Sequence, residues 1–317
     1  MGMVAAEAAY RHGEPWLVAL LDYLRANPAH FAAAVNGTGL VRQGPEIRGG
    51  RSGLHAGETW FPPRDRGSGD QPAEGSLVTG LPHGSDDKGE KMRINDDFSR
   101  QVTVQAGQMD WVASPAKGVD RKMLYRVGDE VARATSIVRY APGSAFPAHA
   151  HTGGEEILVL EGTFQDEHGD YPAGCYFRNP PGTAHSPAAK DGCVIFVRLW
   201  QYRKGDTAQI VRQPGQGDAA PLRPGAVSAQ TLFDDGAERV ALEDWQPGAD
   251  VQIANPRGLE MLVLSGNVTV DGQALGAQGW HRRPAGMPLE ARIGVAGARV
   301  WIKDAPLQHA DVLQMPQ

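Results

Sequence analysis

Apolar residues in the first 42 positions of the chain recur with the period of an α-helix. Most of them fall on one stripe when successive residues are placed about 100° apart, and they include Trp16, Leu17, Leu20, Leu21 and Leu24. Pro28 stands where a second short helix over residues 29–35 can begin. The pattern predicts a short helical extension over residues 1–42.

The next segment, residues 43–91, breaks this pattern. It is rich in Gly, Pro, Ser and charges of both signs and has few apolar side chains. Such a stretch cannot bury enough apolar surface to offset the entropy that a chain loses when it becomes ordered. We therefore expect a disordered linker here and a folded part that begins at Met92.

From residue 92 onward the apolar positions form short, β-rich runs at the spacing of hairpins, separated by Gly and Pro. In residues 92–205 these runs cover 102–104, 109–112, 123–127, 134–140, 156–160, 175–178 and 193–202. The chain's 40 Gly and 23 Pro fit many short strands better than long helices. The pattern predicts an all-β fold class, with a compact barrel or sandwich over residues 92–205.

The last part of the chain, residues 206–317, repeats this pattern at lower fidelity. Three pairs of segments carry the repeat: Trp245-Gln-Pro-Gly248 with Tyr140-Ala-Pro-Gly143, Glu260-Met-Leu-Val-Leu-Ser-Gly266 with Glu156-Ile-Leu-Val-Leu-Glu-Gly162, and 279–286 with 174–182. An internal repeat of this length predicts two stacked barrels in one chain.

Four side chains of metal-ligand type stand close together in the first predicted barrel. His149 and His151 are two residues apart, so on a strand both point to one face. Glu155 follows a pair of glycines that permits a tight reversal, and His185 follows a Pro-Pro-Gly turn. Imidazole and carboxylate ligands suit Fe²⁺, Zn²⁺, Mn²⁺ or Ni²⁺. We expect these residues to bind one divalent metal ion, Fe²⁺ or Zn²⁺ ahead of Mn²⁺ or Ni²⁺; the alternative is ordinary polar residues on a half-exposed hairpin.

The second copy of the pattern does not retain these side chains. Ala254, Pro256, Leu259 and Leu289 stand at or near the places of the four ligands, and none of them can hold a transition metal. We interpret His281 as a satisfied surface or core residue rather than a ligand. The second barrel is therefore expected to be a scaffold or an apolar pocket without a metal centre.

The glycines and ligand-type residues of residues 143–162 resemble the first conserved motif of the cupin superfamily. That motif is Gly, five residues, His-x-His, three or four residues, Glu, six residues and Gly. The chain matches every position, with Gly143, His149, His151, Glu155 and Gly162.

A second cupin motif is Gly, five residues, Pro-x-Gly, two residues, His, three residues and Asn. The chain matches it with Gly174, Pro180, Gly182 and His185 but has Ala189 in the Asn position. Residues 169–182 resemble the ChrR-type cupin branch in particular, and the whole resemblance covers about residues 92–205. It implies a tandem bicupin with one degenerate barrel, His149, His151, Glu155 and His185 as metal ligands, and a homodimer formed by sheet or edge pairing.

Residues 1–40 resemble a fragment of a pyridoxal-phosphate-dependent C–S lyase. The likeness lies in Tyr10-Arg-His-Gly-Glu-Pro-Trp-Leu17 and in Leu20-Leu-Asp-Tyr-Leu24. Since this short piece has no context for a Schiff-base lysine, we expect no pyridoxal phosphate.

Charge and composition narrow the function classes. A net charge of −6 and a pI near 5.9 argue against nucleic acid and against an anionic membrane surface as partners. No apolar run approaches the ~20 residues of a membrane span, and the first residues lack the features of a secretory signal. The two cysteines, Cys175 and Cys193, are too few for a disulfide framework. We expect a cytoplasmic protein whose partner is a small-molecule substrate or ligand.

Arg198 is a candidate for a supporting role at the metal, since it interrupts the apolar run Val194-Ile-Phe-Val-Arg-Leu-Trp200. It could hold an oxyanion or orient Glu155, or it could be an edge arginine in water.

Three functions compete on this basis. The first is a non-haem Fe²⁺ dioxygenase that acts on a small diketone or hydroxyketone, as the resemblance to acetylacetone-cleaving enzymes implies. The second is a zinc-binding sensor or regulator like the ChrR sensory domain, although the chain has no cysteine before Cys175 for the anti-sigma zinc motif. The third is a metal-stabilised binding protein without turnover.

Overall fold

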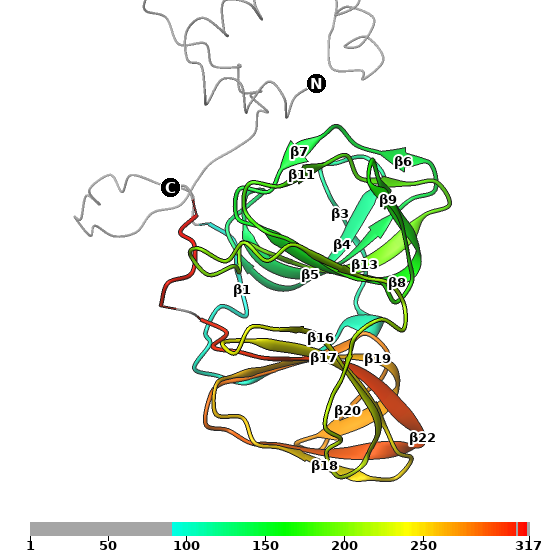
Figure 1. Ribbon diagram of the computed structural model, residues 1–317, viewed down its shortest axis with the longest axis vertical. Coiled ribbons are helices and arrows are strands. Elements are labelled where there is room, and N and C mark those ends of the chain that lie inside the picture. Colours follow the sequence, from blue (N-terminus) through cyan, green and yellow to red (C-terminus); the bar gives the residue numbers. More distant parts are fainter. Residues whose placement is uncertain (1–90, 309, 316–317) are drawn as a thin grey trace, which may run out of the picture. The chain divides into compact units, whose positions relative to one another are not determined.

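The computed structural model describes residues 91–308 and 310–315, and these are nearly all β (Figure 1). The all-β fold class is therefore confirmed. The helical extension expected over residues 1–42 and the linker expected over 43–91 lie outside the described residues, except for Lys91. Within the described part the helical element is one 3-10 turn, η1 (Ala106–Gln108), and no helix there is long and apolar enough to cross a membrane.

The first barrel is built on one large antiparallel sheet. In spatial order its strands are β1 (Arg93–Ile94), β4 (Val119–Val127), β5 (Arg133–Tyr140), β13 (Cys193–Leu199), β8 (Glu155–Asp166), β10 (Tyr176–Asn179) and β14 (Ile210–Arg212). Six short strands complete the barrel. β3 (Val112–Ala113) pairs with β4, β9 (Gly169–Pro172) pairs with β8, and β12 (Ala188–Ala189) pairs with β8 and with β6 (Ser144–Ala145), while β7 (His149–Ala150) and β11 (Ala184–His185) pair with each other. The long strand β8 pairs with β13 and β10 in its first half and with β9 in its second, so it bends from one side to the other.

The second barrel has the same kind of sheet. In spatial order its strands are β15 (Asp218–Ala219), β16 (Ala226–Asp234), β17 (Arg239–Trp245), β22 (Leu289–Asp304), β19 (Leu259–Val270), β21 (Gly279–Arg283) and β2 (Val102–Gln105). Two more strands, β18 (Asp250–Ile253) and β20 (Gln273–Leu275), pair with β22 and β19. Figure 1 shows the two barrels stacked, as the internal repeat predicts.

The barrels exchange edge strands. The run at 102–104 is a strand, as predicted, but as β2 it pairs with β21 of the second barrel rather than with the first. In return β14, which follows the first barrel in sequence, pairs with β10 of that barrel. The predicted run at 109–112 is a strand only at Val112–Ala113. β10 of the first barrel and β21 of the second are thus each covered by a strand that belongs in sequence to the other half of the described chain, which pairs their hydrogen-bonding edges.

Three hydrophobic clusters follow from the alternation of side chains along the strands. Ile157 and Val159 of β8 point into the first barrel, where both cysteines are also buried and free. Leu158 points the other way, into a cluster shared with Trp301 of β22. The third cluster fills the second barrel. Strand β8 is therefore buried on both faces, and its odd-numbered residues in this stretch face the first barrel's interior.

Candidate metal centre

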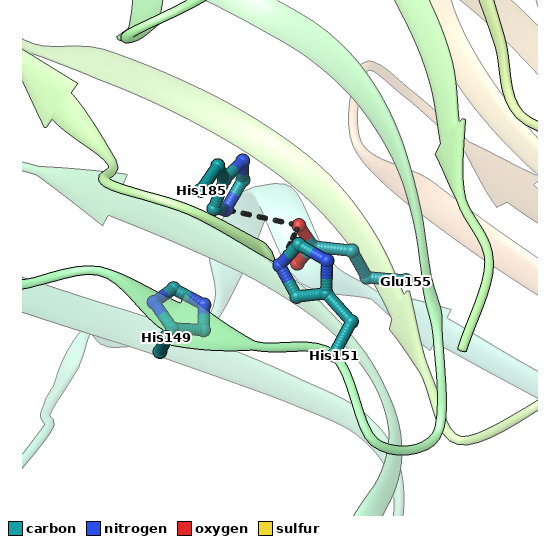
Figure 2. A group of neighbouring side chains, drawn as sticks. All are labelled: His149, His151, Glu155 and His185. Atoms are coloured by element: carbon teal, nitrogen blue, oxygen red, sulfur yellow. Dashed lines mark ion pairs between the residues drawn. The ribbon is translucent and has the colours of Figure 1, made fainter. Parts of the chain in front are cut away.

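The four ligand-type side chains come together at one end of the first barrel (Figure 2). One nitrogen or oxygen atom from each of His149, His151, Glu155 and His185 lies within 4.8 Å of the others. The relative exposures of His151, Glu155 and His185 are 7%, 6% and 2%, whereas His149 is exposed. In the part of the chain that the structure describes, this is the one such group of three or more residues.

Two short strands hold the histidines in place. In the β7–β11 pair His149 lies directly opposite His185. His151 follows β7, where its backbone NH donates to the Thr183 carbonyl at 2.8 Å and its carbonyl accepts from the Gly182 NH at 3.0 Å. The ring centroids of the three histidines are 4.5–5.2 Å apart in pairs. The Pro-Pro-Gly turn and the His-x-His segment thus face each other across a narrow ladder.

Two aromatic side chains approach the backbone between His151 and Glu155 so closely that both positions require glycine. A Cβ atom on Gly153 would lie 1.9 Å from Cδ2 of Trp200, and one on Gly154 would lie 2.5 Å from Cδ2 of Tyr202. Gly154 also has a φ of +72°, which favours glycine. Two aromatic rings therefore pack against the reversal that brings Glu155 back towards the histidines.

Two histidine rings are fixed through their Nδ1 atoms. Nδ1 of His151 lies 2.8 Å from the Thr183 hydroxyl, which itself donates to the Pro180 carbonyl at 2.8 Å. The hydroxyl is therefore the acceptor for Nδ1–H. Nδ1 of His185 lies 3.3 Å from Oδ2 of Asp166, which can only accept when ionised. Both rings thus present the lone pair of Nε2 to the site.

These lone pairs face a carboxylate oxygen, and this observation tests the fit of a metal. Nε2 of His151 and Nε2 of His185 lie 3.0 and 3.1 Å from the same atom, Oε1 of Glu155. Nε2 of His151 is buried and has no hydrogen-bond partner among the described residues. A cation between these atoms would be a common partner for the two nitrogens and the carboxylate oxygen, so the arrangement suits a bound metal ion. The set of three imidazoles and one carboxylate fits a divalent metal site.

The protonation states agree with this fit. Burial lowers the pKa of the His185 imidazole below its ordinary value despite the neighbouring Glu155, so the ring is neutral at pH 7. Burial acts to raise the pKa of Glu155, but His151, His185 and the amide of Asn179 outweigh it and the net pKa is lowered. Asn179 Nδ2 donates to Glu155 Oε1 at 3.1 Å. Neutral imidazoles and an ionised carboxylate are the forms that bind metals.

Arg198 does not lie beside the four ligand-type side chains. It projects from β13 on the opposite face, where its guanidinium forms ion pairs with Glu156 at 2.6 Å and with Glu260 of the second barrel at 3.0 Å. It is not an edge arginine in water either, because its exposed fraction is 3%.

The supporting residues of the site were not found by sequence reasoning. Asp166, Thr183 and Asn179 come from the end of β8, from the turn before β11 and from the end of β10. Asn179 could have been recognised from the sequence, since it directly precedes the Pro-Pro-Gly turn of the second motif. Asp166 and Thr183 are common turn residues and carry no such signal.

The second barrel has no comparable site among its described residues. Leu259 and Leu289 are buried in its hydrophobic core. His281 is fully buried, lies 2.9 Å from the Thr103 hydroxyl through Nδ1, and accepts from Arg283 Nε at 3.2 Å. It is a satisfied core residue, as expected.

Comparisons with known proteins agree with the fold. Residues 99–203 match the model of the ChrR cupin-like domain family, and a search of curated proteins gives no match. The chain is similar to the bacterial pirin YhhW of Escherichia coli in complex with nickel(II), at 15% identity and a TM-score of 0.50 over 65% of this chain and 99% of that one.

Two further solved structures show the same fold. A Nostoc punctiforme protein described as a candidate dioxygenase has 17% identity and a TM-score of 0.50 over 69% of this chain and 88% of that one. YlbA of Escherichia coli has 15% identity and a TM-score of 0.52 over 72% of this chain and 100% of that one. The motif spacing, the antiparallel barrel and the family match over residues 99–203 together show that the chain contains a cupin-type domain.

Proposed function

We propose that this protein is a metal-dependent oxidoreductase, a non-haem Fe²⁺ dioxygenase that acts on a small diketone or hydroxyketone. The observation that carries the proposal is the set of three imidazoles and one buried carboxylate, whose ligand atoms lie within 4.8 Å of one another. Such a set leaves coordination positions free for substrate and co-substrate. Bound Fe²⁺ would supply Lewis acidity towards an enolisable ketone and redox chemistry towards dioxygen.

The residues of the chain set the charge and the shape of the site. Glu155 is the one anion of the ligand set, so a divalent ion would keep a net positive charge that favours an enolate. Behind the site the barrel is filled, because the Phe164 ring lies 5.6 Å from the ring of His185 and packs against Phe177. Since His149 is the exposed ligand, substrate would enter from its side. These features support a small substrate.

We also infer that the second barrel is a degenerate cupin. The strand order β4-β5-β13-β8-β10 of the first barrel recurs as β16-β17-β22-β19-β21 in the second. Strands β8 and β19 have 12 residues each and occupy the same place in that order. The loss of the ligands leaves this barrel a structural role.

A second candidate is a zinc-binding sensor or binding protein without turnover. The match of residues 99–203 to the ChrR cupin-like family favours it, and so does the tight packing around the site. Zinc accepts the same nitrogen and carboxylate ligands as iron.

The deciding experiment is oxygen uptake by anaerobically purified protein reconstituted with Fe²⁺, over a panel of β-diketones and aromatic hydroxyketones. We expect uptake that depends on one compound class and disappears in His149→Ala and Glu155→Gln. His168→Ala is the matched control, since the side chain of His168 is 64% exposed and lies outside the ligand set. No uptake from protein with one bound iron per chain would refute the dioxygenase and favour the zinc-binding candidate.

A further inference from the structure

Two rows of charged side chains face each other between the barrels. The first row runs across the neighbouring strands β10, β8 and β13 and consists of Arg178, Glu156 and Arg198. The second row runs across β21, β19 and β22 and consists of Arg282, Glu260 and Lys303. All six side chains are buried. Each row has a carboxylate between two cations, at corresponding places in the two barrels.

The rows are joined by crossed ion pairs. Arg198 of the first barrel reaches Glu260 of the second at 3.0 Å, and Lys303 of the second reaches Glu156 of the first at 2.9 Å. The Lys303 ammonium also lies 3.0 Å from Oε1 of Glu238. Lys303 therefore joins a carboxylate of each barrel.

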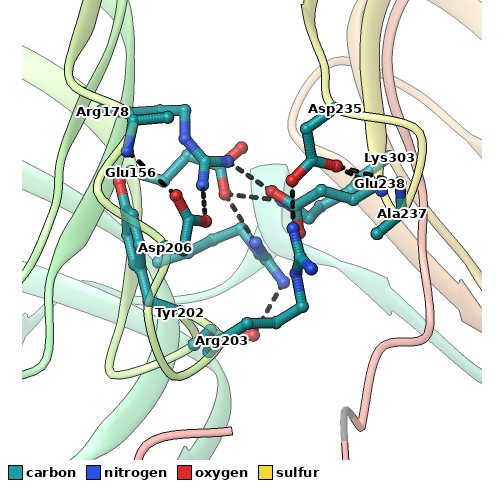
Figure 3. Close-up of polar contacts among 12 residues, drawn as sticks. Glu156, Arg178, Tyr202, Arg203, Asp206, Asp235, Ala237, Glu238 and Lys303 are labelled. Atoms are coloured by element: carbon teal, nitrogen blue, oxygen red, sulfur yellow. Dashed lines mark hydrogen bonds and ion pairs between the residues drawn. The ribbon is translucent and has the colours of Figure 1, made fainter. Parts of the chain in front are cut away.

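A second connection runs through Arg178 (Figure 3). Its guanidinium pairs with Glu238 of the second barrel and with Asp206 at 2.6 Å. It also stacks on the rings of Tyr202, with its central carbon 4.6 Å from the ring centroid, and of Phe233, at 3.8 Å. Glu238 is thus a common partner of Arg178 and Lys303.

Glu156 and Arg178, which form ion pairs with the second barrel, are each next in sequence to a residue of the proposed metal centre. Glu156 follows the ligand Glu155, and Arg178 precedes Asn179, whose amide donates to Glu155. Successive residues of a strand point to opposite faces, so the same short stretch of backbone carries the contact with the second barrel on one face and the contact with the metal centre on the other. Tyr202, on which Arg178 stacks, donates its hydroxyl to the backbone carbonyl of Glu155 at 3.0 Å.

We propose that Lys303 and Glu238 of the second barrel are positioning residues of the metal centre in the first. They hold the ends of β8 and β10 through Glu156 and Arg178 and so keep the Glu155 carboxylate aimed at the histidines. This inference rests on metal binding by the proposed site. It gives the barrel without ligands a direct part in metal affinity.

The physical reason is the burial of these charges. Removing the Lys303 ammonium leaves Glu156 paired with Arg198 and Glu238 paired with Arg178, but the cluster then has one positive charge fewer in a dry interior, where uncompensated charge is disfavoured. Glu156 and Glu238 then shift towards their remaining partners and move the strand ends with them. A metal ligand tolerates displacements of only about 0.5 Å, and loss of a supporting contact lowers metal affinity about 10–100-fold.

The test uses the full chain and three variants. Lys303→Met keeps an unbranched side chain, one atom shorter than lysine, but removes the charge, and Lys303→Arg restores the charge. Arg292→Met is the matched control, because it removes an ion pair with Asp250 on the exposed surface of the same barrel. The readouts are Zn²⁺ affinity by chelator competition, the visible absorption spectrum of the Co²⁺ form, and the melting temperature of the metal-free form.

We expect Lys303→Met to lower Zn²⁺ affinity at least 10-fold and to alter the Co²⁺ spectrum, with recovery in Lys303→Arg and no change in Arg292→Met. Wild-type affinity and spectrum in folded Lys303→Met protein overturn the inference, and so does an equal loss in Arg292→Met. If Lys303→Met does not fold, Glu238→Gln, which keeps its shape, takes its place with the same expected loss. Wild-type protein that binds no metal would instead refute the metal site itself.

Discussion

Acid should weaken the contact between the barrels through one carboxyl group, Glu156. Burial acts to raise the pKa of this group, but Lys303, then Arg198 and Arg178, outweigh burial and lower the pKa from 4.5 to about 2. In the unfolded chain the group has its ordinary pKa. Because the folded pKa is the lower one, the stabilisation is complete above pH 4.5 and is lost as the pH falls towards 2.

The size of the effect follows from the two pKa values. A pKa lowered from 4.5 to about 2 corresponds to about 3 kcal/mol of unfolding free energy. Glu156→Gln removes the charge at every pH and leaves Lys303 and Arg198 each with one carboxylate partner, Glu238 and Glu260. Loss of one partner of a buried pair typically costs about 3–5 kcal/mol, and the remaining partners place this variant at the lower end. We expect the variant to be less stable than wild type at pH 7 by about 3 kcal/mol or more, and the gap to narrow as the pH approaches 2.

The assay is urea unfolding of metal-free protein between pH 7 and 3, so that protonation of metal ligands does not add to the signal through metal release. Wild type should lose unfolding free energy below pH 4.5 more steeply than Glu156→Gln, by up to about 1.4 kcal/mol per pH unit for one proton. Glu161→Gln is the control, since Glu161 lies further along β8 and is exposed. A gap between wild type and Glu156→Gln that stays constant from pH 7 to 3 would refute the reasoning.

Three further predictions concern the first barrel. Gly153→Ala should weaken metal binding and cost about 1–3 kcal/mol of stability, because the new Cβ would lie 1.9 Å from the Trp200 ring; Gly276→Ala, with its nearest atom at 3.5 Å, is the control in thermal unfolding. Asp166→Asn should lower Zn²⁺ affinity about 10–100-fold, since it removes the charge that orients His185; an unchanged dissociation constant would contradict this. Burial raises the pKa of both cysteine thiols, so a disulfide reagent at pH 8 should label neither in folded protein and both after unfolding.

The ligand cluster could be predicted from sequence because its spacing is local. His149, His151 and Glu155 lie within seven residues, and the glycines that define the reversal lie between them. Asp166 and Thr183 were missed because their contacts depend on how β8 and β11 bend towards each other, and residue type alone does not reveal that.

Two placements could not be predicted from the pattern of apolar residues. Strand β13 is apolar on both faces, since Ile195 packs inside the first barrel and Phe196 packs between the barrels. In a strand that is apolar on both faces, the pattern of apolar residues does not show to which side Arg198 points. The run at 102–104 was predicted correctly as a strand, but its partner β21 is almost 180 residues away, and a hydrophobic pattern specifies a strand without specifying its partner.

The two faces of β8 suggest why a barrel without ligands can remain part of this molecule. Glu155 and Ile157 face the interior, where they serve the ligand set and the core, while Glu156 and Leu158 face the second barrel. In the second barrel Leu259 and Leu289 lie in the interior, and the outer face of the same sheet carries other side chains. That face supplies Lys303 and Trp301 to the contact. The side chains that fill the second barrel and those that contact the first barrel can therefore vary independently, because they lie on opposite faces of the same strands.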